Sequence, residues 1–147
     1  MVNKELEEKR AKYIFKNGKQ YKPALCPSNI IRGKVGDCFD VCLLNAVKFG
    51  YGYVEGLAMN PNNKEEWILH AWLTDGDNAF DPTWKAIDNE GVEKPIPTVY
   101  FGLPMDTFRV FDFVKETEYK SVIENFDKNI FLGELAISKD FPKNDAL

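Results

Sequence analysis

The feature that most constrains the fold is a change of hydrophobic period near residue 50. Residues 38–49, CFDVCLLNAVKF, carry apolar side chains at helical spacing and end at Gly50, which is typical of an amphipathic helix. The residues that follow instead form short apolar runs separated by the turn sequences NPNN and DGD. The predicted strands span 53–59, 67–74 and about 78–81. The sequence therefore predicts one central helix followed by strands, the last two joined by a tight hairpin.

The rest of the chain is predicted to surround this core. We find no internal repeat, low-complexity tract or long linker, so we expect a single domain over residues 1–147, a size that can bury a hydrophobic core. An N-terminal helix at 3–16 lies in a brace segment (1–20), the core spans 36–84, and a C-terminal strand and helices occupy 98–128. Prolines and glycines predict an extended loop over 21–36 and a second loop over 82–97. Further elements are a strand at 98–101, helices within 106–119 and 121–125, and a tail over the last ten or so residues.

Charge and composition exclude some classes of function. The chain has 23 acidic and 19 basic residues and a formal net charge of −4, whereas a protein that neutralises phosphates normally carries a basic surplus or stripe. We therefore expect no nucleic-acid partner. No apolar run approaches the roughly 20 residues that cross a bilayer, and the first thirty residues contain no secretory signal pattern. We expect a cytoplasmic protein with no membrane partner, and the sequence does not indicate an oligomeric state.

Three cysteines, Cys26, Cys38 and Cys42, form no even disulfide framework, so we expect free thiols. Cys38 opens the predicted central helix, and Asp37 before it is the expected N-cap. A free thiol has a pKa of about 8.5, and the unpaired amides and macrodipole of a helix N-terminus favour the thiolate. Cys38 is therefore the candidate nucleophile.

A thiol nucleophile also needs a base, and His70 is the one histidine of the chain. An imidazole that faces a thiol with one nitrogen needs an acceptor on the other, which fixes its tautomer and supports its positive charge. If strands 67–74 and 78–81 form an antiparallel hairpin, Asp81 lies directly or diagonally across from His70. The sequence thus predicts a Cys38–His70–Asp81 triad.

Each of these residues also has a plainer interpretation when taken alone. Cys38 could be a small buried hydrophobe, His70 a half-buried strand residue, and Asp81 a turn residue before proline. A zinc site could use Cys38, Cys42 and His70 with Cys26 or Asp81, but it would lack the close Cys-x-x-Cys pair usual in such sites. We therefore expect no metal.

The segments GDCFDVCLLNAVKFGYGYVEGLAM and HAWLTDGDNAFDPTW resemble the core of the transglutaminase-like superfamily, which has a papain-like cysteine enzyme fold. The shared features are the helix-opening Cys, a Val-x-Gly motif, His-x-Trp, a hairpin and Asp-Pro-Thr. The match covers residues 36–84. The resemblance implies an α+β fold in which the central helix, with Cys38 at its N-terminus, packs on an antiparallel β-sheet.

The resemblance also implies roles: Cys38 as nucleophile, His70 as general base and acid, and Asp81 as the orienting carboxylate. Family members with this triad attack amide carbonyls through a thioester, which water or an amine resolves. The chain is far shorter than the calcium-dependent multidomain transglutaminases, so we expect no cofactor. The Cys38 amide would be one oxyanion donor, and the second stays open between Asn29, Trp72 and a backbone amide, because no Gln stands where papain-like members have one. Trp72, on the same strand face as His70, would either line the substrate site or pack in the core.

Three hypotheses for function follow. The first is a peptidase or amidase that hydrolyses a peptide or side-chain amide of a protein or peptide substrate. The second, which shares the same acyl-enzyme chemistry, is a protein transamidase that transfers a glutamine acyl group to an amine. The third is a non-catalytic binding module that keeps the fold, which would explain the missing glutamine.

Overall fold

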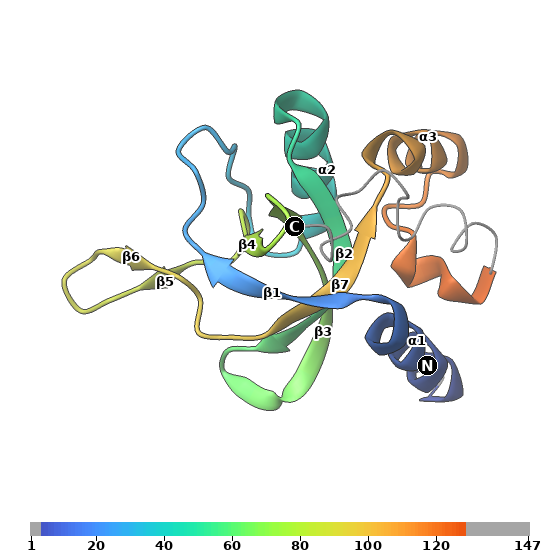
Figure 1. Cartoon of the computed structure of the whole chain (residues 1–147), viewed down its shortest axis with the longest axis horizontal. Coiled ribbons are helices and arrows are strands. Elements are labelled where there is room, and N and C mark those ends of the chain that lie inside the picture. The colour runs from blue at the N-terminus through green and yellow to red at the C-terminus, as the bar shows by residue number, and fades with distance from the viewer. Residues whose placement is uncertain (1–3, 129–147) are drawn as a thin grey trace.

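The computed structural model describes residues 4–128 as an α+β fold, in which helices pack around a closed five-stranded barrel (Figure 1). In chain order the elements are α1 (Lys4–Asn17), β1 (Lys19–Ala24), α2 (Cys38–Phe49), β2 (Gly52–Asn60), β3 (Asn63–Thr74), β4 (Asn78–Phe80), β5 (Ala86–Ile87), β6 (Glu93–Lys94), β7 (Tyr100–Met105), α3 (Thr107–Thr117) and the 3-10 helix η1 (Ile123–Lys128). The predicted tail over the last ten or so residues lies outside the described part of the chain.

The barrel has the strand order β1-β4-β3-β2-β7 and closes between β7 and β1. The long β2–β3 hairpin is its main ladder, and β7 pairs antiparallel to β2. β1 pairs antiparallel to β7 but parallel to β4. The predicted antiparallel sheet is therefore wrong at this pair. The reason is topological, because strands around a closed ring of five cannot all alternate in direction, and one neighbouring pair must be parallel.

The last four residues of β1, 21–24, fall in the segment 21–36, for which the prolines and glycines predict a loop, and one of these prolines, Pro23, lies in the strand. Proline lacks the N–H that a central strand donates, so it is confined to strand edges. The structure satisfies this rule locally: β7 pairs with β1 only at residues 19–21, and β4 pairs with it only at 22–24. At Pro23 the strand therefore has one neighbour rather than two. The loop prediction is wrong for residues 21–24, because β7 pairs with the first half of β1 and β4 pairs with the second half.

Other elements follow the sequence predictions more closely. α2 has the predicted bounds, and α1 ends just before Gly18 as expected. Asp106 caps α3 by accepting a hydrogen bond from the Arg109 amide at 3.1 Å. The predicted strand at 98–101 begins and ends later, as β7, and the predicted loop at 82–97 contains the short β5–β6 arm that projects from the barrel in Figure 1. Across residues 4–128, none of the helices combines the length and the apolar character that a membrane span requires.

Two apolar clusters lie on opposite faces of the sheet, as the alternation of side chains along a strand requires. Outside the barrel, Tyr53, Leu57 and Leu73 pack against buried residues of α2 and α3. Inside it, Trp72 belongs to a smaller cluster, whose other buried members are Tyr21, Val54, Ala58, Ala79 and Tyr100. Trp84 packs against this inner cluster from the loop after β4.

A pair of glycines lies between two neighbouring strands of the barrel, where Gly56 on β2 pairs with Gly102 on β7. A Cβ atom on Gly56 would lie 2.3 Å from the Gly102 Cα atom, far inside van der Waals contact. A Cβ atom on Gly102 would lie 2.8 Å from the ring of Trp72. This glycine pair allows β2 and β7 to approach beside the strand position of His70, which pairs with Gly56 on the other side.

Candidate active site

Cys38 is the first residue of α2 and is 6% exposed. Asp37 occupies the N-cap position as predicted, but its side chain makes no capping hydrogen bond, so the predicted bond from its carboxylate to the first turn is wrong. Its backbone carbonyl still accepts the amide of Val41 at 2.9 Å, so the first helical turn forms. The physical reason lies in the backbone, since Asp37 has φ −102° and ψ 21°, outside the extended region from which a side chain normally reaches back to the first turn.

His70 lies on β3 with its side chain almost completely buried, and its Nε2 atom lies 2.8 Å from Asp81 Oδ2. Asp81 follows β4, which is joined to β3 by a tight turn. The pairing of Leu73 with Phe80 places Asp81 diagonally from His70, so the predicted contact across this hairpin is confirmed.

The Cys38 thiol lies near enough to the His70 side chain to help raise the pKa of its imidazole. Because Nε2 is taken by Asp81, Nδ1 is the nitrogen left to face the sulfur. The His70 ring lies on the same side of β3 as Trp72, and α2 contacts β3 so that its first residue comes near this ring. The structure thus brings together all three residues of the predicted triad.

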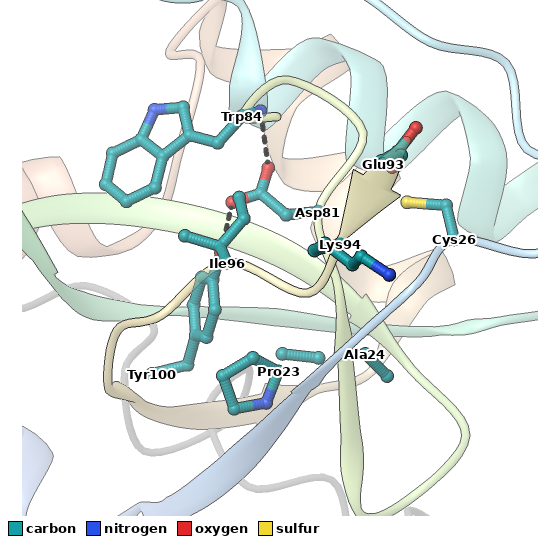
Figure 2. A pocket seen from close by; sticks show the side chains of 10 residues that line it. Pro23, Ala24, Cys26, Asp81, Trp84, Glu93, Lys94, Ile96 and Tyr100 are labelled. Atoms are coloured by element: carbon teal, nitrogen blue, oxygen red, sulfur yellow. Dashed lines mark hydrogen bonds between the residues drawn. The ribbon is translucent and has the colours of Figure 1, made fainter. Parts of the chain in front are cut away.

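Five hydrogen bonds hold the Asp81 carboxylate. Its Oδ1 atom accepts from the Thr83 amide at 3.1 Å, the Thr83 hydroxyl at 3.2 Å and the Trp84 amide at 3.0 Å. Its Oδ2 atom accepts from the Tyr100 hydroxyl at 2.7 Å and contacts His70 at 2.8 Å. Figure 2 shows Tyr100 pointing at one carboxylate oxygen and the Trp84 backbone bonded to the other. The carboxylate is therefore fixed in both position and rotation.

The electrostatics of the pair favour the charged forms of both residues. Burial lowers the pKa of His70, but the charge and hydrogen bond of Asp81, together with Cys38, raise it to about 9. Burial raises the pKa of Asp81, yet the His70 charge and hydrogen bonds from His70, Tyr100 and Trp84 hold it below its usual value. At neutral pH the site therefore favours an imidazolium beside a carboxylate.

The Trp84 indole covers one face of the His70 ring. The two rings are stacked, with centroids 4.0 Å apart and an interplanar angle of 24°. An aromatic face attracts a cation and excludes water, so this contact also favours the imidazolium. Trp84 ends the Asp-Pro-Thr-Trp run, and its position three residues after Asp81 is the signal in the sequence for this contact.

The structure places the two predicted substrate-binding residues apart from each other. Trp72 is fully buried inside the barrel, packed against Tyr21 and Tyr100 with ring centroids 5.8 and 5.0 Å apart. It has no exposed surface with which to line a substrate site. Asn29 is exposed in the loop after β1, and its Oδ1 accepts the Tyr51 hydroxyl at 2.6 Å. A role for Asn29 in substrate binding stays a prediction.

The other two cysteines are poor nucleophiles. Cys42 is completely buried, and desolvation raises the pKa of its thiol well above the usual value. Burial also raises the pKa of the half-buried Cys26 to about 11. All three thiols are free. Within residues 4–128 we find no group of three or more His, Cys, Asp or Glu side chains arranged to hold a metal ion.

A small cavity adjoins Asp81 (Figure 2). It is lined in part by Cys26, Trp84, Lys94 and Tyr100. Its volume of about 10 Å³ is close to the space of one water molecule, so it is too small for an acyl group.

Tyr100 is a further residue of this site that the sequence did not indicate. It lies in a predicted strand, 19 residues beyond Asp81, and no local spacing connects the two.

Comparison of the chain with known proteins finds no matching family model, no similar curated protein and no similar solved structure.

Proposed function

We propose that the protein is a cysteine acyl-transfer enzyme that hydrolyses a peptide or side-chain amide through a thioester on Cys38. One observation carries the proposal: a buried imidazole lies between the Cys38 thiol and the Asp81 carboxylate, 2.8 Å from the latter. This is the arrangement that activates a thiol and keeps a proton available for the leaving group.

The reaction has two steps. The Cys38 sulfur attacks the substrate carbonyl carbon, the carbon–nitrogen bond breaks, and His70 gives its proton to the departing amine. Water then attacks the thioester carbonyl while His70 accepts a proton from it. The carbon–sulfur bond breaks, the acid leaves, and the thiol and imidazole return to their starting state. Asp81 supports the positive charge that His70 carries between these transfers.

The oxyanion of each tetrahedral intermediate requires hydrogen-bond donors. Cys38 is the first residue of α2, so its backbone amide has no partner within the helix and belongs to the positive end of the helix dipole. We assign this amide as one donor, which would stabilise the developing negative charge. The exposed amide group of Asn29 is the candidate for the second.

A transglutaminase-like relationship is part of this proposal. It is supported by the chain order Cys, His, Asp, by the helix-opening cysteine, and by a histidine and an aspartate on adjacent strands. The barrel differs from the expected sheet because β1 closes it with a parallel pair. The triad itself is built from α2, β3 and the residue after β4, so it does not depend on that difference.

Selective alkylation tests the nucleophile. Iodoacetamide near pH 7 should modify Cys38 faster than Cys26 or Cys42, because burial suppresses ionisation of the other two thiols. Peptide mass spectrometry after brief labelling would measure the three rates. A His70→Gln variant should lose this selectivity, and a Cys38→Ser variant should lose the fast phase. Equal rates for all three cysteines in the folded wild-type protein would refute the proposal.

A second experiment distinguishes a hydrolase, a transamidase and a non-catalytic binding module. The protein is mixed with an activated acetyl ester, and intact-mass measurements follow the added acetyl group. An enzyme should acquire one acetyl group on Cys38 and release it to water. Faster release in the presence of a primary amine would assign a transamidase, whereas no acetylation with intact folding would assign a binding module. Cys38→Ser as bait in a lysate would then capture protein substrates.

A further inference from the structure

Tyr100 and His70 bind the same oxygen of Asp81. The Tyr100 hydroxyl donates to Oδ2 at 2.7 Å, and His70 Nε2 lies 2.8 Å from that atom. All three side chains are buried, with Tyr100 1% exposed. In such surroundings a hydrogen bond to a charged oxygen is stronger than in water.

The two oxygens of Asp81 are held in different ways. Oδ1 accepts three hydrogen bonds from Thr83 and Trp84, which lie two and three residues along the chain. This local turn already fixes the position and rotation of the carboxylate. The Tyr100 hydroxyl comes from β7, on the far side of β1 in the barrel, and binds the one oxygen that also supports the imidazolium. Its effect is therefore on the charge of Oδ2 rather than on the place of Asp81.

We propose that Tyr100 acts on His70 through Asp81. By sharing Oδ2 with the imidazole, it limits how strongly Asp81 holds the His70 proton. A donor on Oδ2 withdraws negative charge from the contact with His70. Without it, the carboxylate would stabilise the imidazolium more strongly, and the acid that must protonate a leaving amine would be weaker. The catalytic consequence rests on the proposed function, whereas the effect on His70 does not.

Several other groups surround the pair, and none competes for Oδ2. Cys38 on α2 faces His70 itself, and Trp84 stacks on its ring without charge. The titratable groups on the far side of Asp81 line its cavity: Cys26, Glu93 and Lys94. A substitution of Tyr100 is therefore expected to change the pKa of His70 through Oδ2 alone.

The single histidine of the chain makes the test simple, because one set of imidazole NMR signals reports the pKa of His70. Tyr100→Phe should raise that pKa by about 0.5 to 1, roughly half of the effect that the full free energy of a hydrogen bond to a charged group would have, because Asp81 accepts the bond in both protonation states of His70. Tyr53→Phe is the matched control, since the Tyr53 hydroxyl also donates to a buried carboxylate, Glu55, at 2.6 Å. This control should leave the pKa of His70 unchanged.

A second variant keeps the test valid if Tyr100→Phe fails to fold. Site-specific replacement of Tyr100 by 3-fluorotyrosine retains the hydroxyl and makes it a stronger donor. It should lower the pKa of His70, the opposite sign. A Thr83→Val variant, which removes one of three donors from Oδ1, should raise the pKa by less than Tyr100→Phe does.

The outcomes are separable from those of the proposed function. An unchanged or lowered pKa of His70 in folded Tyr100→Phe, or an unchanged or raised pKa with 3-fluorotyrosine, would overturn the role of Tyr100. Selective alkylation of Cys38 in wild-type protein would then still support the nucleophile. If Cys38 is not selectively alkylated but the two variants shift His70 in opposite directions, the proposed function fails and the inference about Tyr100 stands.

Discussion

His70 Nε2 lies 2.8 Å from Asp81 Oδ2, and the two side chains are 3% and 4% exposed. A contact at this depth between two ionisable groups makes the stability of the fold depend on pH. It also makes the site sensitive to the loss of either partner, since the remaining group would stay buried without its counter-ion.

We expect the free energy of unfolding to fall as the pH rises from 7 to 9. The folded-state pKa of His70 is about 9, above the ordinary value of 6.5, so the folded protein binds this proton more tightly. The stabilisation is complete below the unfolded pKa and is lost as the pH rises through 9, with a slope of at most about 1.4 kcal/mol per pH unit. Urea unfolding at several pH values measures it. His70→Gln should lack this slope, and a persistent slope in that variant would assign it to another group.

Asp81→Asn should lower the pKa of His70 below its usual value, because burial then opposes the imidazolium without a nearby anion. Alkylation of Cys38 at pH 7 should slow by about 10²- to 10⁴-fold, the range typical of a disabled acid–base partner. Asp88→Asn is the control. Asp88 also accepts turn amides, at 2.8 and 2.9 Å, but it lies in the β5–β6 arm. Equal losses in the two variants would indicate a general folding defect rather than a triad.

Glu55 provides a second, independent pH effect. This fully buried carboxylate accepts the Tyr53 hydroxyl at 2.6 Å and the Ile123 amide at 2.7 Å, and so fixes the segment before η1 to β2. Burial raises the pKa of Glu55 from 4.5 to about 7. Its stabilisation is complete below pH 4.5 and is lost as the pH rises through 7.

Glu55→Gln should flatten the decrease in stability between pH 4.5 and 7, because the amide keeps an acceptor and cannot ionise. Glu55→Ala should cost about 2 to 4 kcal/mol at pH 6, since it leaves a buried hydroxyl and buried amides without an acceptor. Urea midpoints and hydrogen exchange at the Val122 and Ile123 amides measure the two effects. Equal stability of the Ala and wild-type proteins would contradict this role.

Gly56→Ala should destabilise the barrel by about 2 to 4 kcal/mol, the range of overpacking where a backbone must move. The new methyl group would meet Gly102 Cα at 2.3 Å and the Phe101 carbonyl oxygen at 2.4 Å, both backbone atoms. Gly91→Asn is the contrasting change: Gly91 has φ 81° but open space around its Cα, and Asn tolerates that conformation. Thermal unfolding should separate the two, and similar melting temperatures would refute the close approach.

The parts of the site that depend on local pattern could be predicted from the sequence. Cys38 opens a helix whose period is visible over twelve residues, and the tight turn between β3 and β4 fixes the approach of Asp81 to His70. Asp37 stands at the N-cap position as predicted, but its side-chain bond does not form, because capping depends on a backbone conformation that the residue type favours but does not impose.

The parts of the fold and of the site that were not predicted depend on contacts between distant segments. Tyr100 meets Asp81 only because β7 joins the barrel, and Glu55 binds amides 67 and 68 residues further along. Pro23 favoured a loop, yet it lies in β1. The strand tolerates the proline because β7 and β4 pair with different halves of β1. Contacts between such distant segments leave no pattern in any short stretch of the sequence.

The closure of the barrel by β1 also governs when a complete site can exist. β1 pairs with β7, which lies some eighty residues later, so the ring cannot close until that strand has been synthesised. Pairings of high sequence separation form late and slowly in folding. A growing chain would therefore carry Cys38, His70 and Asp81 before Tyr100, 19 residues beyond Asp81, and the partner that shares Oδ2 would be the last to join. The charge on His70 would then take its final value only when β7 has joined the barrel.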